Sequence, residues 1–357
     1  MSDCEAATQD VASAVAGQAA PPFPSWAHLL PRSAADPLAT AFLSSLEVRG
    51  FSHNTILAYG RALDSLIEMA GPLGAVRLDA NCVYGFLAHL RQTASRHPAA
   101  GGSRLAPATV RQRVVGLRAY ADYLVDCGRL ERNPVTRGSI RHTPEGEVIP
   151  MRRGLVPLAR CVPRLPTDEQ WTRLLDAVRP RPVRDRLMFM LAYDGALRRN
   201  ELVTLRLDDF DFAARQAVIR AEQAKGGYPR TIVYSPATSS LLRSYLPERR
   251  DLVPGTPLVF LSKSPRNRAS PVGGYTWGLV AAALAREANV PGFSTHTLRH
   301  LRLTDLARAG LDITEIAKFA GHRSLATTML YIHLSGRDMA RAFERASRVL
   351  TDRFERL

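Results

Sequence analysis

The stretch AGHRSLATTMLYIHLS, residues 320–335, joins two predicted helices and carries two side chains that an apolar core does not require. Gly321 is typical of a helix C-terminus, because glycine readily adopts the left-handed conformation that ends many helices. His322 follows at once, and Tyr331 comes nine residues later in the apolar run LYIHL. Taken singly, His322 fits a helix end and Tyr331 fits a core. Their meaning therefore depends on what the rest of the chain supplies.

Other polar residues stand at the ends of predicted elements in the second half of the chain. Arg198 and Arg199 follow the apolar run RLMFMLAYDGAL, which predicts a buried helix. Lys225 lies in the turn between two strand-like runs, QAVIRA and RTIVYS. His296 and Arg299 are three residues apart at the start of a predicted helix, so both face the same side.

Two arginines, two histidines, one lysine and one tyrosine are what phosphoryl transfer without a metal requires. Arg and His donors stabilise the charge that develops on the nonbridging oxygens of a phosphodiester. A tyrosine hydroxyl can attack phosphorus and form a covalent ester, and a lysine can protonate the leaving 5′-oxygen. The sequence contains no acidic metal cluster and no glycine-rich phosphate loop. We therefore expect neither a metal nor another cofactor.

The charge balance indicates a nucleic-acid partner. Lys and Arg number 48 against 33 Asp and Glu, for a net charge of +15, and the only lysines are Lys225, Lys263 and Lys318. Arginine is suited to phosphate, because its planar fork binds two oxygens at once. The four cysteines are scattered without a zinc-site spacing, which favours a reducing compartment. No apolar run is long enough to cross a membrane.

The periodicity predicts two structured regions between less regular segments. Residues 1–35 are rich in Ala, Gly, Pro and Ser and are predicted to be a disordered arm. Residues 36–135 contain four amphipathic helical patterns and are predicted to form a small helical bundle. Basic residues lie on its polar sides and suggest a face that follows phosphates: Arg104, Arg111, Arg113 and Arg118.

Residues 136–165 lack periodicity and are rich in Pro, Gly and Arg, as expected of an interdomain linker. Residues 166–357 form the second predicted domain. It opens with a capping box of Thr167 and Gln170, contains the two strand-like runs, and is otherwise mostly helical.

HTLRH at 296–300, AGH at 320–322 and Tyr331 together resemble the tyrosine recombinase, or phage integrase, family. The likeness spans residues 36–357. It implies a mainly α fold with a small β-hairpin or sheet. A helical, SAM-like core-binding domain and a mixed α+β catalytic domain would form a C-shaped clamp on DNA. Single motifs of this kind are weak, but six in the right order and spacing are specific.

Two further segments carry the resemblance. DGALRRNELVTLRLDDFD resembles the family's first arginine box, in which Leu-Arg precedes two residues and Glu-Leu. This selects Arg198 over Arg199 and makes Glu201 a supporting carboxylate. AKGGYPRTIVY resembles the family's β-hairpin and places its lysine at Lys225. Arg199 and Asn200 depart from the small or apolar residues usual after the first arginine.

The resemblance implies a role for each residue. Arg198 and Arg299 would clamp the scissile phosphate, and His296 and His322 would donate hydrogen bonds to it or assist proton transfer. Lys225 would be the general acid and Tyr331 the nucleophile, giving a 3′-phosphotyrosine and a free 5′-hydroxyl. His300 would support the catalytic side chains without contacting the phosphate itself.

The resemblance also implies partners. These are double-stranded DNA and a homo-tetramer, or a partner recombinase, assembled on paired sites through a C-terminal helix. The apolar stripe of Met339, Phe343, Ala346, Leu350 and Phe354 favours that docking, and docking onto the chain's own domain is the alternative. The acidic N-terminus lacks the basic region of a secretory signal, so we expect a cytoplasmic protein. Because the resemblance implies a DNA partner, we expect it at the nucleoid of a bacterial cell.

Several functions remain open at this stage. Site-specific integration, excision or transposon recombination is the first. Chromosome- or plasmid-dimer resolution and a catalytically idle DNA-binding relative are alternatives. A type IB topoisomerase-like enzyme would share the chemistry, but the separate helical domain and the C-terminal helix favour a recombinase.

Overall fold

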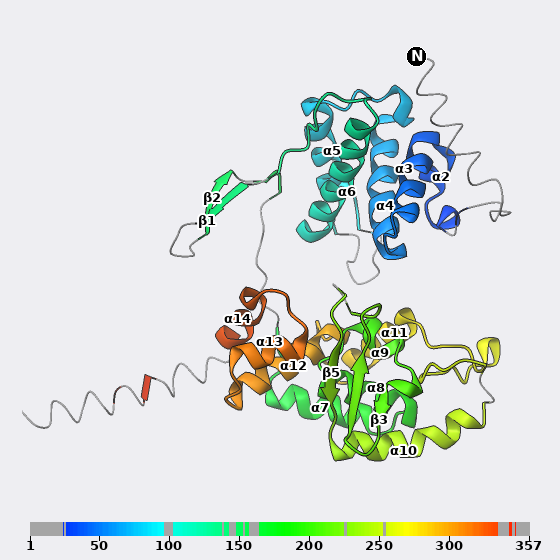
Figure 1. Cartoon of the computed structure of the whole chain (residues 1–357), viewed down its shortest axis with the longest axis vertical. Coiled ribbons are helices and arrows are strands. Elements are labelled where there is room, and N and C mark those ends of the chain that lie inside the picture. Colours follow the sequence, from blue (N-terminus) through cyan, green and yellow to red (C-terminus); the bar gives the residue numbers. More distant parts are fainter. Residues whose placement is uncertain are drawn as a thin grey trace, which may run out of the picture. The chain divides into compact units, whose positions relative to one another are not determined.

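The computed structural model describes residues 24, 26–95, 103–137, 139–142, 148–152, 154–156, 164–224, 227–252, 255–334, 343–344 and 347. The chain divides into two compact units, Met1–Arg160 and Cys161–Leu357. The division falls within the predicted linker. The fold is mainly helical with small antiparallel sheets, as predicted (Figure 1).

Unit 1 is a helical bundle whose elements lie in the order η1 (Ala27–Leu29), α2 (Pro31–Ala35), α3 (Pro37–Val48), α4 (His53–Ala70), η2 (Leu73–Ala75), α5 (Ala80–Gln92) and α6 (Pro107–Asp126). The four predicted amphipathic helices are α3 to α6. Their apolar faces meet in one core that includes Phe42, Leu63, Phe86 and Leu117. Burial of such faces, rather than helix propensity, supplies most of the stability of helices this short.

Order begins earlier than predicted. The segment before Asp36 was predicted to be disordered, but η1 and α2 lie there and contribute Trp26 and Leu30 to the core of unit 1. The Ser33 hydroxyl donates to Asp64 at 2.6 Å, which fixes α2 on α4. Isolated apolar anchors of this kind leave no periodicity for a sequence pattern to reveal.

Two further features of unit 1 differ from the sequence expectation. The predicted linker contains an antiparallel hairpin of β1 (Ser139–His142) and β2 (Val148–Arg152). Arg118, predicted to lie on a phosphate-binding face, donates to the carbonyls of Val135 and Thr136 at 3.1 and 2.9 Å. It therefore ties the end of the bundle together.

Unit 2 builds its main core from the N-terminal helices, the sheet and the middle helices. In order these are α7 (Asp168–Val178), α8 (Val183–Asp194), α9 (Arg199–Val203), η4 (Leu207–Asp209), β3 (Phe210–Asp211), β4 (Gln216–Ile219), β5 (Arg230–Val233), α10 (Pro236–Arg250), η5 (Pro265–Asn267) and α11 (Gly274–Glu287). The predicted capping box of Thr167 and Gln170 starts α7. The apolar helix α8 lies in the core, with Leu187, Phe189 and Leu191 fully buried.

The sheet of unit 2 has the order β3-β4-β5, and all pairs are antiparallel. In β4 and β5 the register pairs Ala217 with Ile232, and both are buried against the core. The two predicted strand runs are β4 and β5. Helix α10, which contains Pro247, was not predicted.

Three C-terminal helices complete the described part of unit 2: α12 (Thr295–Arg308), α13 (Ile313–Ala320) and α14 (Leu325–Leu334). Gly321 ends α13 in the left-handed conformation, with φ of 63°, as the sequence indicated. Most of the predicted subunit-exchange helix lies outside the described residues. No helix in the described segments is long and apolar enough to cross a membrane.

Candidate active site

Helices α12, α13 and α14 pack around a small apolar cluster that is separate from the main core. Its buried members are Ala196, Leu303, Ile316, Ala320 and Tyr331. Ala196 lies in the turn after α8 and has φ of 46°, a conformation uncommon outside glycine. Two residues later Arg198 donates to the Gly321 carbonyl at 3.3 Å. The turn thus brings the first arginine beside the Gly-His pair.

Arg299 is the buried centre of the site, with 4% of its surface exposed. Its Nη1 donates to the Ala196 carbonyl at 2.6 Å, and its Nη2 donates to the Ala320 carbonyl at 2.6 Å. Burial lowers its pKa to about 10, and the charge of Arg198 adds to this effect. Arg299 stays protonated at neutral pH and joins the turn after α8 to the end of α13.

His322 stacks on Tyr331 and is hydrogen-bonded at both ring nitrogens. Its Nε2 lies 3.0 Å from Arg299 Nη2, and its Nδ1 lies 2.9 Å from the hydroxyl of Thr328. A guanidinium can only donate, so Nε2 accepts and Nδ1 carries the proton. Burial and the charge of Arg299 lower the pKa of His322 to about 4. His322 is therefore neutral at physiological pH.

Tyr331 is 3% exposed, and its hydroxyl lies 2.9 Å from His300 Nδ1. Its ring stacks on the His322 ring with 5.9 Å between centroids. Burial raises the pKa of Tyr331, and the charges of Arg299 and Arg198 oppose that increase. The phenol is therefore protonated at neutral pH. When it loses its proton, the charges of Arg299 and Arg198 stabilise the phenolate.

Glu201 is a fully buried carboxylate between two arginines. It accepts from Arg198 Nη1 at 2.7 Å and from Arg230 Nη1 and Nη2 at 3.0 and 2.7 Å. Burial alone would raise its pKa, but the hydrogen bonds and charges of Arg230 and Arg198 outweigh burial and lower it to about 2. The carboxylate therefore stays ionised and orients the Arg198 side chain.

His296 is exposed at the start of α12. Partial desolvation lowers its pKa, followed by the charges of Arg199, Arg299 and Arg198. Arg199 is exposed, and its side chain lies over the backbone of Gly274. His296 thus lies close enough to Arg198 and Arg299, the two predicted arginines, for their charges to lower its pKa. Arg199 is a third arginine with the same effect.

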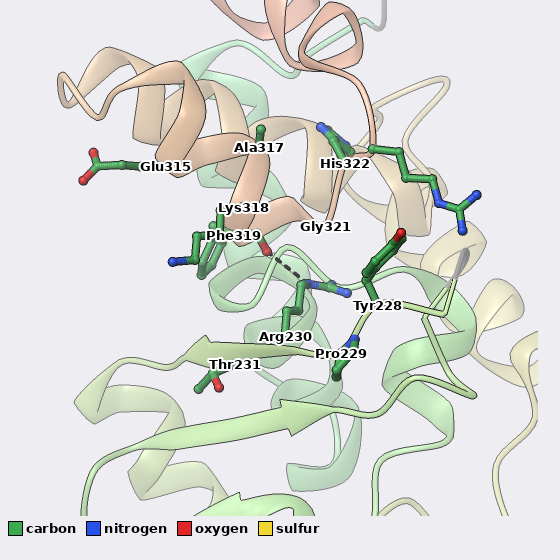
Figure 2. A pocket seen from close by; sticks show the side chains of 11 residues that line it. Tyr228, Pro229, Arg230, Thr231, Glu315, Ala317, Lys318, Phe319, Gly321 and His322 are labelled. Atoms are coloured by element: carbon green, nitrogen blue, oxygen red, sulfur yellow. Dashed lines mark hydrogen bonds between the residues drawn. The ribbon is translucent and has the colours of Figure 1, made fainter.

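An open cavity of about 930 Å³ adjoins the site between β5 and α13. Lys318 and Arg323 give its lining a positive charge, which Glu315 partly offsets, and the third cation of the lining, Arg230, is paired with Glu201. Figure 2 shows Arg230 reaching from the sheet to the Phe319 carbonyl, to which Nε donates at 3.0 Å. The Arg323 guanidinium lies 5.2 Å from the centre of the Tyr228 ring. Such a basic hollow beside the site suits a phosphate backbone.

The structure brings five of the predicted catalytic side chains into one neighbourhood: Arg198, His296, Arg299, His322 and Tyr331. It also includes both predicted supporting residues, Glu201 and His300. Lys225 lies outside the described residues. No group of three or more His, Cys, Asp or Glu that could hold a metal occurs within the described ranges.

Two residues of the cluster were not predicted. Arg230 opens β5 and completes the pairing of Glu201, and the Thr328 hydroxyl accepts a hydrogen bond from His322 Nδ1. Each acts through contacts between distant segments, and neither stands in a motif that the sequence made recognisable. The only available signal was that a buried carboxylate needs compensating donors, of which Arg198 alone supplies too few.

Comparison with known proteins identifies the class. Residues 165–337 match the phage integrase family. The tyrosine recombinase XerC of Erythrobacter litoralis is 30% identical over 297 residues, which are 82% of this chain and 86% of that protein. The tyrosine recombinase XerA of Pyrococcus furiosus is 28% identical over 190 residues, 53% of this chain and 64% of that protein.

Among solved structures, the Tn1549 transposon integrase in complex with transposon right end DNA is similar in fold. Its TM-score is 0.60 at 18% identity, covering 85% of this chain and 98% of that one. The chain therefore belongs to the phage integrase family of tyrosine recombinases. It is a site-specific recombinase that cleaves and rejoins DNA, and its named relatives are Xer-type recombinases.

Glu201→Gln is expected to destabilise unit 2 and to slow DNA cleavage. The amide leaves Arg198 and Arg230 without a carboxylate, and breaking a buried ion pair costs about 3–5 kcal/mol. Urea unfolding and single-turnover cleavage at saturating DNA measure the two effects. Glu287→Gln is the matched control, because Glu287 pairs with Arg181 at the surface, where a pair is worth about 1 kcal/mol or less. Equal unfolding free energies for the two variants would contradict the role given to Glu201.

Unit 2 is expected to lose stability as the pH falls from 6.5 towards 4. The pKa values of His300 and His322 are lowered from 6.5 to about 4, so the unfolded chain binds these protons first. Stability rises with pH wherever the unfolded state binds more protons. Above pH 6.5 both histidines are neutral in the folded and in the unfolded chain, so the free energy of unfolding is at its full value. Acidification to pH 5 lowers this free energy by about 2 kcal/mol per histidine.

Urea unfolding at pH 7 and pH 5 measures this loss. His322→Asn removes one of the two groups, so its unfolding free energy should depend less steeply on pH. An unfolding free energy that is the same at both pH values in the unsubstituted protein would contradict the assignment of neutral, buried imidazoles.

Proposed function

We propose that Tyr331 is the nucleophile of this recombinase and that cleavage leaves a 3′-phosphotyrosine ester and a free 5′-hydroxyl. The observation that carries the proposal is the position of the Tyr331 hydroxyl. It is buried among His300, His322 and Arg299, with a hydrogen bond of 2.9 Å to His300 Nδ1. A tyrosine that served only the core would not need His300 at hydrogen-bond distance from its hydroxyl and the charge of Arg299 beside it.

The same proposal assigns the other residues. Arg198 and Arg299 bind the nonbridging oxygens of the scissile phosphate and stabilise the charge that develops on them. Glu201 holds Arg198 in place. His296 donates a hydrogen bond to the phosphate, His322 accepts from Arg299 and so holds that guanidinium in place, and Lys225 protonates the leaving 5′-oxygen.

We further propose that the enzyme acts on two paired DNA sites. The phosphotyrosine ester keeps the energy of the broken bond, so the 5′-hydroxyl of a second duplex can attack it without ATP. Such exchange requires several subunits. We propose a homo-tetramer, or an assembly with a partner recombinase, that is joined through the C-terminal helix. The separate helical unit, Met1–Arg160, supports the proposal of a second domain that grips the DNA.

Integration, excision or transposon recombination in the bacterial cytoplasm, at the nucleoid, is the biological role we propose. The high arginine content supports a protein that stays in contact with DNA. The base sequence of the target is set by contacts to base edges, which phosphate-binding arginines do not make.

A nicked suicide duplex tests the reaction. DNA that flanks the gene supplies candidate sites, and the nick lets the 5′-hydroxyl fragment diffuse away, so the ester accumulates. We expect an adduct that survives denaturation, forms without metal or ATP, and maps to Tyr331 by peptide mass. The released fragment should accept phosphate from a kinase without prior phosphatase treatment. An adduct on another residue, or a 5′-phosphate on the fragment, would overturn the proposal.

A further inference from the structure

The nucleophilic hydroxyl must lose a proton when it attacks phosphorus, and the structure limits where that proton can go. Of the basic side chains around Tyr331, arginines cannot accept a proton, because a guanidinium has no free lone pair. The histidines are the remaining candidates. Three of them lie in the cluster: His296, His300 and His322.

His322 has no lone pair to offer in this arrangement. Its Nε2 already accepts from Arg299, and its Nδ1 carries a proton that is directed to Thr328. Its ring is stacked against the Tyr331 ring, so its nitrogens are not aimed at the hydroxyl. His296 is exposed on the first turn of α12, and no contact joins it to Tyr331 among the described residues.

His300 has both the position and the lone pair. Its Nδ1 lies 2.9 Å from the Tyr331 hydroxyl, and its ring centre lies 5.6 Å from the Tyr331 ring centre. The charge of Arg299 acts on the same hydroxyl and opposes the rise in its pKa that burial causes. In the tautomer of His300 that carries its proton on Nε2, the lone pair of Nδ1 faces the Tyr331 hydroxyl and can accept the phenol proton.

The surroundings of His300 keep it neutral and ready to accept. Burial lowers its pKa to about 4, and the neighbouring His296 and Arg299 on α12 add to the effect. Tyr331 faces it from α14, and His322 faces it from the loop before α14. On the α8 side, the Tyr193 hydroxyl donates to Asp305, which is five residues further along α12.

We infer that His300 is the general base of the cleavage step, an inference that rests on the proposed function. As the bond between Tyr331 Oη and phosphorus forms, the phenol proton passes to His300 Nδ1. The bond between phosphorus and the 5′-oxygen breaks, and that oxygen takes a proton from the general acid, proposed to be Lys225. In rejoining, the His300 imidazolium returns its proton to the departing Tyr331 oxygen.

The pH dependence of single-turnover cleavage tests this directly. In the unsubstituted enzyme the base is already neutral, so the rate should be nearly constant from about pH 6 to about pH 8.5. This measurement needs no variant. A rate that rises tenfold per pH unit across that range would mean that hydroxide removes the phenol proton, or that preformed phenolate attacks phosphorus. Either result would overturn the inference.

His300→Asn is the informative substitution, because the Asn amide can occupy the position of Nδ1 without being basic. We expect cleavage at pH 7 to be slower by about 10²- to 10⁴-fold, the usual contribution of a positioned base. The rate should then rise about tenfold per pH unit, since only the phenolate can attack. A uniform reduction at all pH values would assign His300 a structural role instead.

A change of leaving group separates the two proton transfers. In a substrate with sulfur in place of the 5′-oxygen, the leaving thiolate needs no proton. Lys225→Ala should then recover its rate, whereas His300→Asn should remain slow. Recovery of His300→Asn on this substrate would place its proton transfer at the leaving group and overturn the inference.

Two controls complete the design. His28→Asn changes an exposed histidine of unit 1 and should keep the flat pH profile of the unsubstituted enzyme. The His300→Asn protein should bind the DNA site as the unsubstituted enzyme does. If the unsubstituted enzyme forms no adduct, the proposed function fails. If it forms the adduct and His300→Asn cleaves at the same rate, only the inference about His300 fails.

Discussion

Tyr331→Phe is expected to abolish the covalent adduct with DNA and to leave DNA binding unchanged. The substitution removes one oxygen atom, which is the attacking atom of the proposed reaction. Within the described residues no other hydroxyl lies at hydrogen-bond distance from His300 Nδ1, so we expect no adduct above background. The adduct is measured on a denaturing gel, and binding is measured by electrophoretic mobility.

The fold should tolerate this substitution well. The phenylalanine ring keeps the contacts with Ala196, Leu303 and the rest of the small apolar cluster. The lost hydrogen bond to His300 should lower the free energy of unfolding by about 1 kcal/mol. Loss of the adduct therefore reports chemistry rather than unfolding.

Tyr193→Phe is the matched control. Tyr193 lies in the same unit, and its hydroxyl donates to Asp305 at 2.8 Å. Its removal costs a comparable hydrogen bond without touching the proposed nucleophile. If both variants formed the adduct equally, Tyr331 would not be the nucleophile. If neither did, the loss would reflect the stability of α12.

Local patterns made most of the candidate site predictable from the sequence. His296 and Arg299 are separated by one helical turn, and Gly321 ends a helix immediately before His322. Residues that a single element positions can be found from spacing. Arg230 could not be found in this way, because its contacts to Glu201 and to the Phe319 carbonyl depend on how β5 packs against α9 and α13.

The fold follows the same division. Helices α3 to α6 have continuous apolar faces, and their sequence pattern was sufficient. Helix α2 is five residues long and is held by Trp26, Leu30 and Ser33, which form no periodic pattern. Helix α10 carries an internal proline and a serine- and arginine-rich surface, so its apolar face is sparse. Tertiary contacts, rather than local preference, determine these two elements.

Arg299→Ala is expected to reduce cleavage by about 10²- to 10⁴-fold beyond any effect on folding. The guanidinium bridges the Ala196 and Ala320 carbonyls and donates to His322 Nε2. Its removal takes a charged donor from the phosphate site, and a single such donor is worth about 10²- to 10³-fold. It also frees His322 and takes away a charge that lowers the pKa of Tyr331.

The stability cost must be separated from the chemical one, because two buried carbonyls lose their donor. Each unsatisfied group costs about 1–3 kcal/mol. Arg249→Ala provides the comparison. Arg249 is also buried, and it donates to the carbonyls of Thr256, Leu258 and Val259 in the loop after α10, without a contact to the site.

Both arginine variants should unfold at lower urea concentrations than the unsubstituted protein. Only Arg299→Ala should also lose cleavage when the assay is run at saturating DNA and at a temperature where both variants are folded. Arg299→Lys should fall between them in rate, because the ammonium keeps the charge but cannot bridge two carbonyls and a phosphate. Equal cleavage by Arg249→Ala and Arg299→Ala would show that Arg299 acts through the fold alone. A specific loss in Arg299→Ala would place its charge at the reacting phosphate, since Arg249 makes the same kind of carbonyl contacts elsewhere in the same unit.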